Sequence, residues 1–189
     1  MTSAFLEAIA DLLAKRSIHV IRFEFGYMAA RRDSGKKRPP PRAEKLTEEY
    51  AAMLASVSER LGKKARLYIG GKSLGGRVAS LIAGEAFRAG QISGLVCLGY
   101  PFHPPGKPDR LRTAHLETLN CPALILQGTR DPFGSRAEVE AMKLSRQCRV
   151  HWIGDGDHDF VPRAASGFTR QGNLEDAADA VAAFTVKRR

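Results

Sequence analysis

The chain has 189 residues and is 43% hydrophobic, which fits one globular domain, expected over residues 1–189. No apolar run is long enough to cross a membrane, and the N-terminal stretch lacks the basic start and apolar centre of a signal peptide. Three cysteines are an odd number, which favours buried thiols in a reducing compartment over disulfides. We therefore expect a cytoplasmic protein without a membrane segment.

The net charge of +10 is partly local, because seven basic and two acidic residues lie between Arg31 and Lys45 and the chain ends Lys187-Arg188-Arg189. Such charge attracts nucleic acid or acidic partners. The stretch has no interleaved aromatic residues for stacking bases, so only phosphate contacts are expected if it binds nucleic acid. A solvated surface segment is the simpler interpretation.

In chain order, apolar runs alternate with helical patterns. Helices are predicted over 3–16 (capped by Thr2 or Ser3), 47–61, 74–87, 135–144 and 174–184, and strands over 18–23, 65–69, 94–98, 122–127 and 150–153. Proline-containing loops are predicted over 25–42 and 101–108. Continuous apolar strands separated by helices predict an α/β fold, a mostly parallel sheet of about five strands with helices on both faces in three layers. Such sheets carry their chemistry at the carboxyl ends of the strands.

The segment Gly71-Lys72-Ser73-Leu74-Gly75 has the pattern Gly-x-Ser-x-Gly between a predicted strand and a predicted helix. A serine on that turn is strained and projects above the sheet, and the flanking glycines prevent collisions with the neighbouring strand and helix. The pattern therefore predicts a nucleophile elbow. The plainer alternative is a glycine turn whose serine only caps the helix.

A serine hydroxyl needs a base to take its proton, and a histidine base needs an acid to orient it. In α/β-hydrolase sheets these groups follow in the chain order serine, acid, histidine. Asp131 comes just past one predicted strand and His158 just past the last one. Ser73, Asp131 and His158 are thus expected at the same edge of the sheet.

Each partner also has a plainer alternative. Asp131 precedes a proline and fits a turn, and His158 stands among aspartates that fit a solvated loop. The aspartates do not match a calcium loop, no Cys/His spacing matches zinc, and Lys72 lacks the glycine that a P-loop requires. We expect no metal and no cofactor.

Segments 20–29, 71–77, 99–107, 127–134 and 157–158 together resemble a family of small predicted α/β-hydrolases, bacterial relatives of the animal testis-expressed protein 30 that are near dienelactone-hydrolase-like proteins. The resemblance implies that Ser73 is the nucleophile, His158 the general base and Asp131 the orienting acid. It implies one oxyanion-hole donor, the Leu74 backbone N–H. It implies no substrate, and some relatives act as subunits of assemblies without evident catalysis.

The chain departs from this family at its start. Relatives carry a further strand and a His-Gly-x-Gly-type loop before the first helix, and Met1 falls just after that point. The resemblance then implies a missing second oxyanion donor. It also implies a gap between strands 18–23 and 65–69, or their direct pairing. We hypothesise that the natural protein starts upstream, which an intact mass would decide.

The leading prediction is a serine hydrolase that acts on an ester, thioester or similar small acyl compound through an acyl-enzyme. Loops 25–42 and 101–112 would roof its pocket, and their basic residues would favour an anionic substrate. The first alternative is a non-catalytic interaction protein on a hydrolase scaffold. The second is weak electrostatic nucleic-acid binding through residues 31–45.

Overall fold

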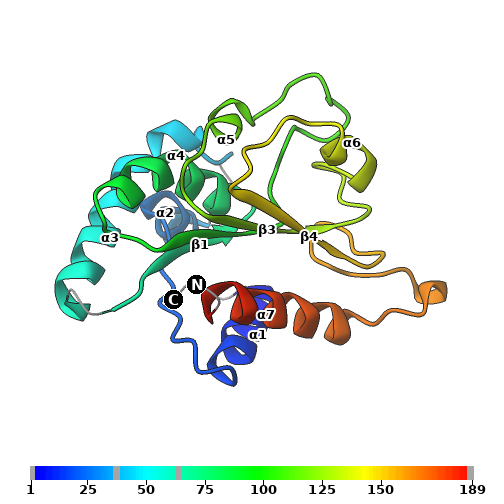
Figure 1. Ribbon diagram of the computed structural model, residues 1–189, viewed down its shortest axis with the longest axis horizontal. Helices are drawn as coiled ribbons and strands as arrows, with labels where there is room; N and C mark the ends of the chain where they lie inside the picture. Colours follow the sequence, from blue (N-terminus) through cyan, green and yellow to red (C-terminus); the bar gives the residue numbers. More distant parts are fainter. Residues whose placement is uncertain (1–2, 36–38, 63–64, 187–189) are drawn as a thin grey trace.

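The computed structural model describes residues 3–35, 39–62 and 65–186. Its centre is a sheet of four parallel strands in the order β1-β2-β3-β4 (Figure 1). The strands are β1 (Tyr68–Lys72), β2 (Gly94–Leu98), β3 (Ala123–Gly128) and β4 (Cys148–Ile153). Of the sequence predictions, Met1, the Thr2 cap, Lys36, Lys37, Arg38 and the tail Lys187-Arg188-Arg189 lie outside the described residues.

Helices cover both faces of the sheet, as Figure 1 shows. They are α1 (Ala4–Ala14), α2 (Gly26–Ser34), α3 (Thr47–Leu61), α4 (Leu74–Arg88), α5 (Ala114–Glu117), α6 (Arg136–Glu140) and α7 (Arg170–Val186), with short 3₁₀ turns at Ala43–Lys45 and Ala164–Ser166. Helices α1 and α7 lie on one face, and α3 and α4 lie on the other. The predicted three-layer α/β fold is therefore confirmed.

The alternation of side chains along the strands explains why two cores form. Leu95 and Cys97 of β2 belong to the core beneath α3 and α4, whereas Leu98 of the same strand belongs to the core with α1 and α7. All six residues of β3 are buried. A strand covered on both faces must be apolar throughout, and for this reason the central strands were readable from sequence.

One predicted strand is wrong. Residues 18–23 run extended but form no strand, so the sheet has four strands instead of about five. A strand exists only through pairing, and within the described residues this segment has no strand beside it. The strand expected over 65–69 is real but forms three residues later, as β1.

The helical predictions hold for α1, α3 and α4, whereas α5 was not predicted and α7 begins at Arg170 instead of at residue 174. Two further helices differ. The expected loop 25–42 contains α2, which precedes the prolines and ends at Gly35 with a left-handed φ of 65°. The helix expected over 135–144 ends at Glu140, although Ser135 and Glu138 form the capping box that starts it. At α1, Ser3 is the cap, since its hydroxyl accepts a hydrogen bond from the Leu6 N–H at 3.4 Å.

The outer edge of β1 is closed by a side chain instead of a strand. The Tyr50 hydroxyl of α3 donates to the Gly70 carbonyl at 2.7 Å and accepts from the Gly70 N–H at 3.0 Å. Burial raises the pKa of Tyr50 to about 12, so the donor keeps its proton. The Phe23 ring packs edge-on against Tyr50 with centroids 5.1 Å apart. Tyr50 thus fills the position of a neighbouring strand.

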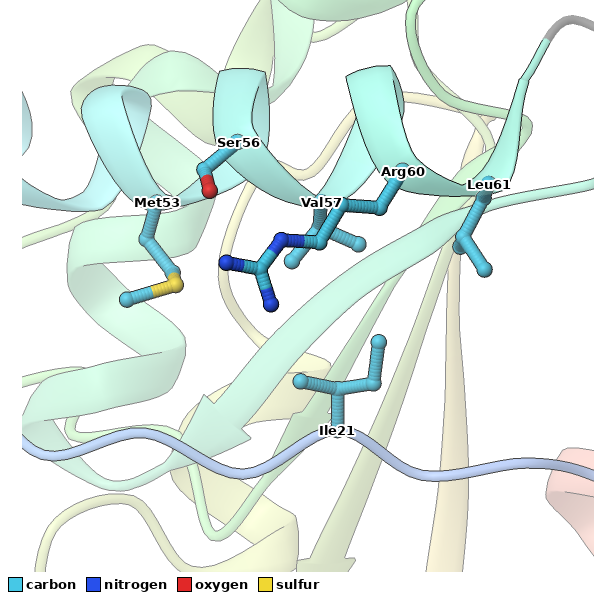
Figure 2. Close-up of a pocket in the computed structure, with 6 residues that line it drawn as sticks. All are labelled: Ile21, Met53, Ser56, Val57, Arg60 and Leu61. Atoms are coloured by element: carbon cyan, nitrogen blue, oxygen red, sulfur yellow. The ribbon is translucent and has the colours of Figure 1, made fainter.

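A pocket of about 330 Å³ lies beside this edge, between the extended segment and α3. Figure 2 shows Ile21 pointing from that segment toward the helix. The lining residues are Ile21, Met53, Ser56, Val57, Arg60 and Leu61. Of the two arrangements expected from the resemblance, the structure shows the gap and not the direct pairing of 18–23 with β1.

Candidate active site

Ser73 is the single residue between the end of β1 and the start of α4. Its φ of 52° and ψ of −116° are unusual for a non-glycine residue, a conformation that costs roughly 1–3 kcal/mol. Its N–H donates to the Leu98 carbonyl at 2.9 Å, and its carbonyl accepts from the Arg77 N–H at 3.0 Å. Its hydroxyl makes no capping hydrogen bond to α4. The plainer interpretation of Ser73 as a helix cap is therefore wrong.

Two glycines allow this sharp turn, and they are not the pair expected. A Cβ on Gly71 would lie 2.7 Å from the carbonyl carbon of Gly75, and one on Gly76 would lie 2.6 Å from the Gly71 oxygen. A Cβ on Gly75 would meet no described atom within 4 Å outside its own helix. The expectation that Gly75 prevents a collision is wrong, because the first turn of α4 meets the strand through Gly76.

Asp131 and His158 lie together, as the sequence predicted. His158 Nδ1 is 2.8 Å from Asp131 Oδ2, the Asp131 side chain is 0% exposed and that of His158 is 19% exposed. The other carboxylate oxygen, Oδ1, accepts the Phe133 N–H at 2.9 Å. The Phe133 ring lies against the imidazole, with centroids 4.4 Å apart. Asp131 therefore makes the expected turn contact and also fixes the imidazole, which is not part of a solvated loop.

The loop that carries His158 folds back across the sheet, from the end of β4 to the end of β2. At Gly99, which follows β2 with a φ of 60°, a Cβ would lie 2.9 Å from the His158 carbonyl oxygen and 3.2 Å from Nδ1. At Gly128, the last residue of β3, a Cβ would lie 2.3 Å from the Asp157 oxygen. Neither Gly99 nor Gly128 was singled out from the sequence. The signal that could have revealed them is that each is a glycine at the carboxyl end of a predicted strand.

The fold thus gathers Ser73, Asp131 and His158 at the carboxyl edge of the sheet. With Nδ1 bound to Asp131, the second ring nitrogen of His158, Nε2, is left for a proton from a nucleophile. No direct hydrogen bond between the Ser73 hydroxyl and His158 occurs among the contacts of the described residues. Such bonds are often long without substrate and tighten when it binds.

Backbone N–H groups at the start of α4 follow Ser73 directly in the chain. The Leu74, Gly75 and Gly76 N–H groups are in its first turn, where no intrahelical acceptor exists. The Leu74 N–H follows the nucleophile directly, which is the position of one donor in this type of site. Among the described residues we assign no second donor.

The described ranges contain neither a cluster of metal ligands nor a helix that could span a membrane. No three His, Cys, Asp or Glu side chains converge there as metal ligands would. Cys97 and Cys121 are buried. No helix in the described part of the chain is both long and apolar enough to cross a bilayer.

Comparison with known proteins agrees with this architecture. Residues 1–186 match the profile of a family described as alpha/beta hydrolase domain, so the chain belongs to that family. Similar solved structures include an alpha-beta serine hydrolase homologue from Coxiella burnetii, with a TM-score of 0.70, 16% identity, and coverage of 97% of this chain and 76% of that one. An esterase domain from Rhodothermus marinus has a TM-score of 0.61 and 14% identity, with coverage of 95% of this chain and 78% of that one. A protein of unknown function from Agrobacterium tumefaciens has a TM-score of 0.65 and 15% identity, with coverage of 96% of this chain and 77% of that one. At these identities the structures share the fold.

Proposed function

We propose that this chain is a serine hydrolase of small acyl compounds, such as esters or thioesters. His158 takes the proton of the Ser73 hydroxyl as the oxygen attacks the acyl carbon, and Asp131 keeps the imidazole oriented. The leaving group departs with the proton from His158, which leaves an acyl group on Ser73. Water activated by His158 then releases the acid and restores the serine.

The observation that carries this proposal is the buried Asp131–His158 hydrogen bond of 2.8 Å at the same edge as the strained Ser73 turn. Burying a carboxylate is costly unless it is hydrogen-bonded, so a fully buried aspartate aimed at a histidine needs a reason. The Ser73 turn is strained and its hydroxyl does not cap α4, so helix capping does not account for the serine. Nucleophilic catalysis accounts for both features. The finer resemblance to relatives of testis-expressed protein 30 assigns the same roles.

The substrate we propose carries a negative charge. Arg77 lies one helical turn after Ser73 in α4. Arg77 is paired with Glu44 at 2.6 Å. Burial lowers the pKa of Arg112, and the positive charge of the nearby Arg77 lowers it further by a smaller amount. A guanidinium partly buried beside another guanidinium gains from an incoming carboxylate or phosphate.

The test is covalent labelling with a fluorescent fluorophosphonate, which reacts only with an activated serine. Wild type and Ser56→Ala, a substitution at an exposed serine of α3, should label equally. Ser73→Ala should not label at all. A separate, unlabelled sample of wild type would then be offered a neutral ester and an ester of equal length ending in a carboxylate, and the charged ester should have the lower KM. Folded wild type that stays unlabelled would overturn the proposal and favour a non-catalytic interaction protein on this scaffold.

A further inference from the structure

Lys72, the residue before the nucleophile, makes contacts that the proposed reaction does not use. Its ammonium lies 3.1 Å from Asp159 Oδ1, although the Lys72 side chain is only 14% exposed. It also lies 5.3 Å from the centroid of the Phe5 ring of α1. Burial lowers the pKa of Lys72, and the Asp159 carboxylate opposes that shift. A lysine side chain is seldom buried to this extent unless its charge is paired, so the ion pair with Asp159 calls for a functional explanation.

Asp159 is the neighbour of His158 in the chain, so the ion pair joins two segments that come from opposite edges of the sheet. On one side, Lys72 ends β1 and is bonded to Ser73. On the other side, Asp159 belongs to the loop after β4, which crosses back over the sheet to bring His158 to Gly99.

The loop has its own constraints, which the lysine supplements. Phe160 is fully buried with a positive φ of 63°, and its ring packs edge-on against Phe5 at 5.3 Å. The Asn173 amide of α7 donates to the Phe160 carbonyl at 2.9 Å. These contacts hold the far end of the loop against α1 and α7. None of these contacts links the His158 loop to the turn that carries Ser73. The Lys72–Asp159 pair does so, because Lys72 precedes Ser73 and Asp159 follows His158.

We propose that Lys72 is a positioning residue, which clamps the His158 loop to the nucleophile turn through its ion pair with Asp159. The inference rests on the proposed function and deepens it. The clamp holds His158 Nε2 within reach of Ser73 while Asp131 fixes the ring's rotation. The charged groups that face this region are Lys72 from β1, Asp131 from the turn after β3, and Asp157 and Asp159 from the loop itself.

The experiment compares Lys72→Met, Lys72→Arg, Asp159→Asn and the double variant Lys72→Met/Asp159→Asn, with Lys143→Met at an exposed position as the control. Each is assayed for its fluorophosphonate labelling rate and its urea unfolding midpoint. Separately, the nuclear Overhauser effect between the His158 imidazole C–H and the Ser73 Hβ protons is followed by NMR. The NMR readout needs no activity, so it tests the clamp even if wild type does not label and the proposed function fails.

We expect Lys72→Met and Asp159→Asn each to slow labelling about tenfold, and the double variant to be no slower than either. Lys72→Arg and Lys143→Met should stay near wild type. Without the ion pair the loop is no longer clamped, so the nuclear Overhauser effect between His158 and Ser73 should weaken in both Lys72→Met and Asp159→Asn, because either substitution removes the same ion pair.

A purely structural lysine would give a different pattern. Labelling would then fall only in proportion to the unfolded fraction, and the nuclear Overhauser effect between His158 and Ser73 in the folded protein would stay as in wild type. Either result would overturn the proposal, as would additive effects in the double variant. If Lys72→Met does not fold, Asp159→Asn breaks the same pair from its 61% exposed side and decides the question alone.

Discussion

Gly99→Ala tests whether the position of His158 depends on a missing side chain at the end of β2. Gly99 has a φ of 60°, a region that costs an alanine about 1 kcal/mol. Its Cβ would lie 2.9 Å from the His158 carbonyl oxygen and 3.2 Å from Nδ1, where ordinary contacts begin near 3.4 Å. The imidazole must therefore move by several tenths of an ångström, which lengthens its bond to Asp131. Misplacement on the order of 1 Å costs about 100-fold in rate, so we expect fluorophosphonate labelling to slow by roughly 10- to 100-fold.

The matched control is Gly90→Ala. Gly90 follows α4 with a φ of 69°, so an alanine there has the same backbone cost, but its Cβ would meet no described atom within 4 Å. Labelling rates and urea unfolding midpoints are measured for both variants. Gly90→Ala should lose about 1 kcal/mol of stability and label like wild type. If Gly99→Ala labels as fast as Gly90→Ala, the reasoning about His158 is refuted.

Two further predictions concern the acid Asp131 and a second, half-buried histidine, His115. Asp131→Asn should leave the fold intact yet slow labelling about 10³- to 10⁴-fold, because an amide no longer selects the imidazole tautomer; an unchanged rate would remove Asp131 from the mechanism. His115, whose Nε2 lies 2.8 Å from the Ser80 hydroxyl, has a pKa lowered to about 4, chiefly by burial and secondly by Arg77. Since the unfolded chain binds that proton below about pH 6.5, the contribution of His115 to stability falls as the pH drops from there toward 4. Allowing for its partial exposure, about 1 kcal/mol should be lost between pH 7.5 and pH 5, and urea unfolding of His115→Gln should show a correspondingly smaller pH dependence.

The inner strands β2 and β3 could be predicted from sequence because they are covered on both faces, so almost all of their residues are apolar. The segment 18–23 has the same β-branched and aromatic character, yet it forms no strand. A strand forms only beside another strand, and the local composition of a segment does not show whether an adjacent strand is present. Helix α2 was missed for the opposite reason, since the prolines that suggested a loop come only after it has ended at Gly35.

Asp131 and His158 were predictable as partners because each follows a buried strand, and parallel strands end at one edge. The fold back of the His158 loop toward β2 was not predictable, since it depends on spatial contacts at Gly99 and Gly128. The role of Gly76 was missed because a sequence pattern names the glycines around a serine without saying which of them faces the strand. The Lys72–Asp159 pair joins residues far apart in the chain, and only the folded arrangement brings them together.

The Tyr50 hydroxyl at the edge of β1 has a consequence for how copies of this protein meet one another. A free strand edge presents donors and acceptors that can recruit a strand from another molecule, the first step of aggregation. Tyr50 occupies both backbone groups of Gly70 with one oxygen, and α3 stands in front of them. A second chain would have to displace a buried phenol before it could add to the sheet. At the outer edge of β1, Tyr50 and α3 together therefore oppose edge-to-edge association between copies of this protein.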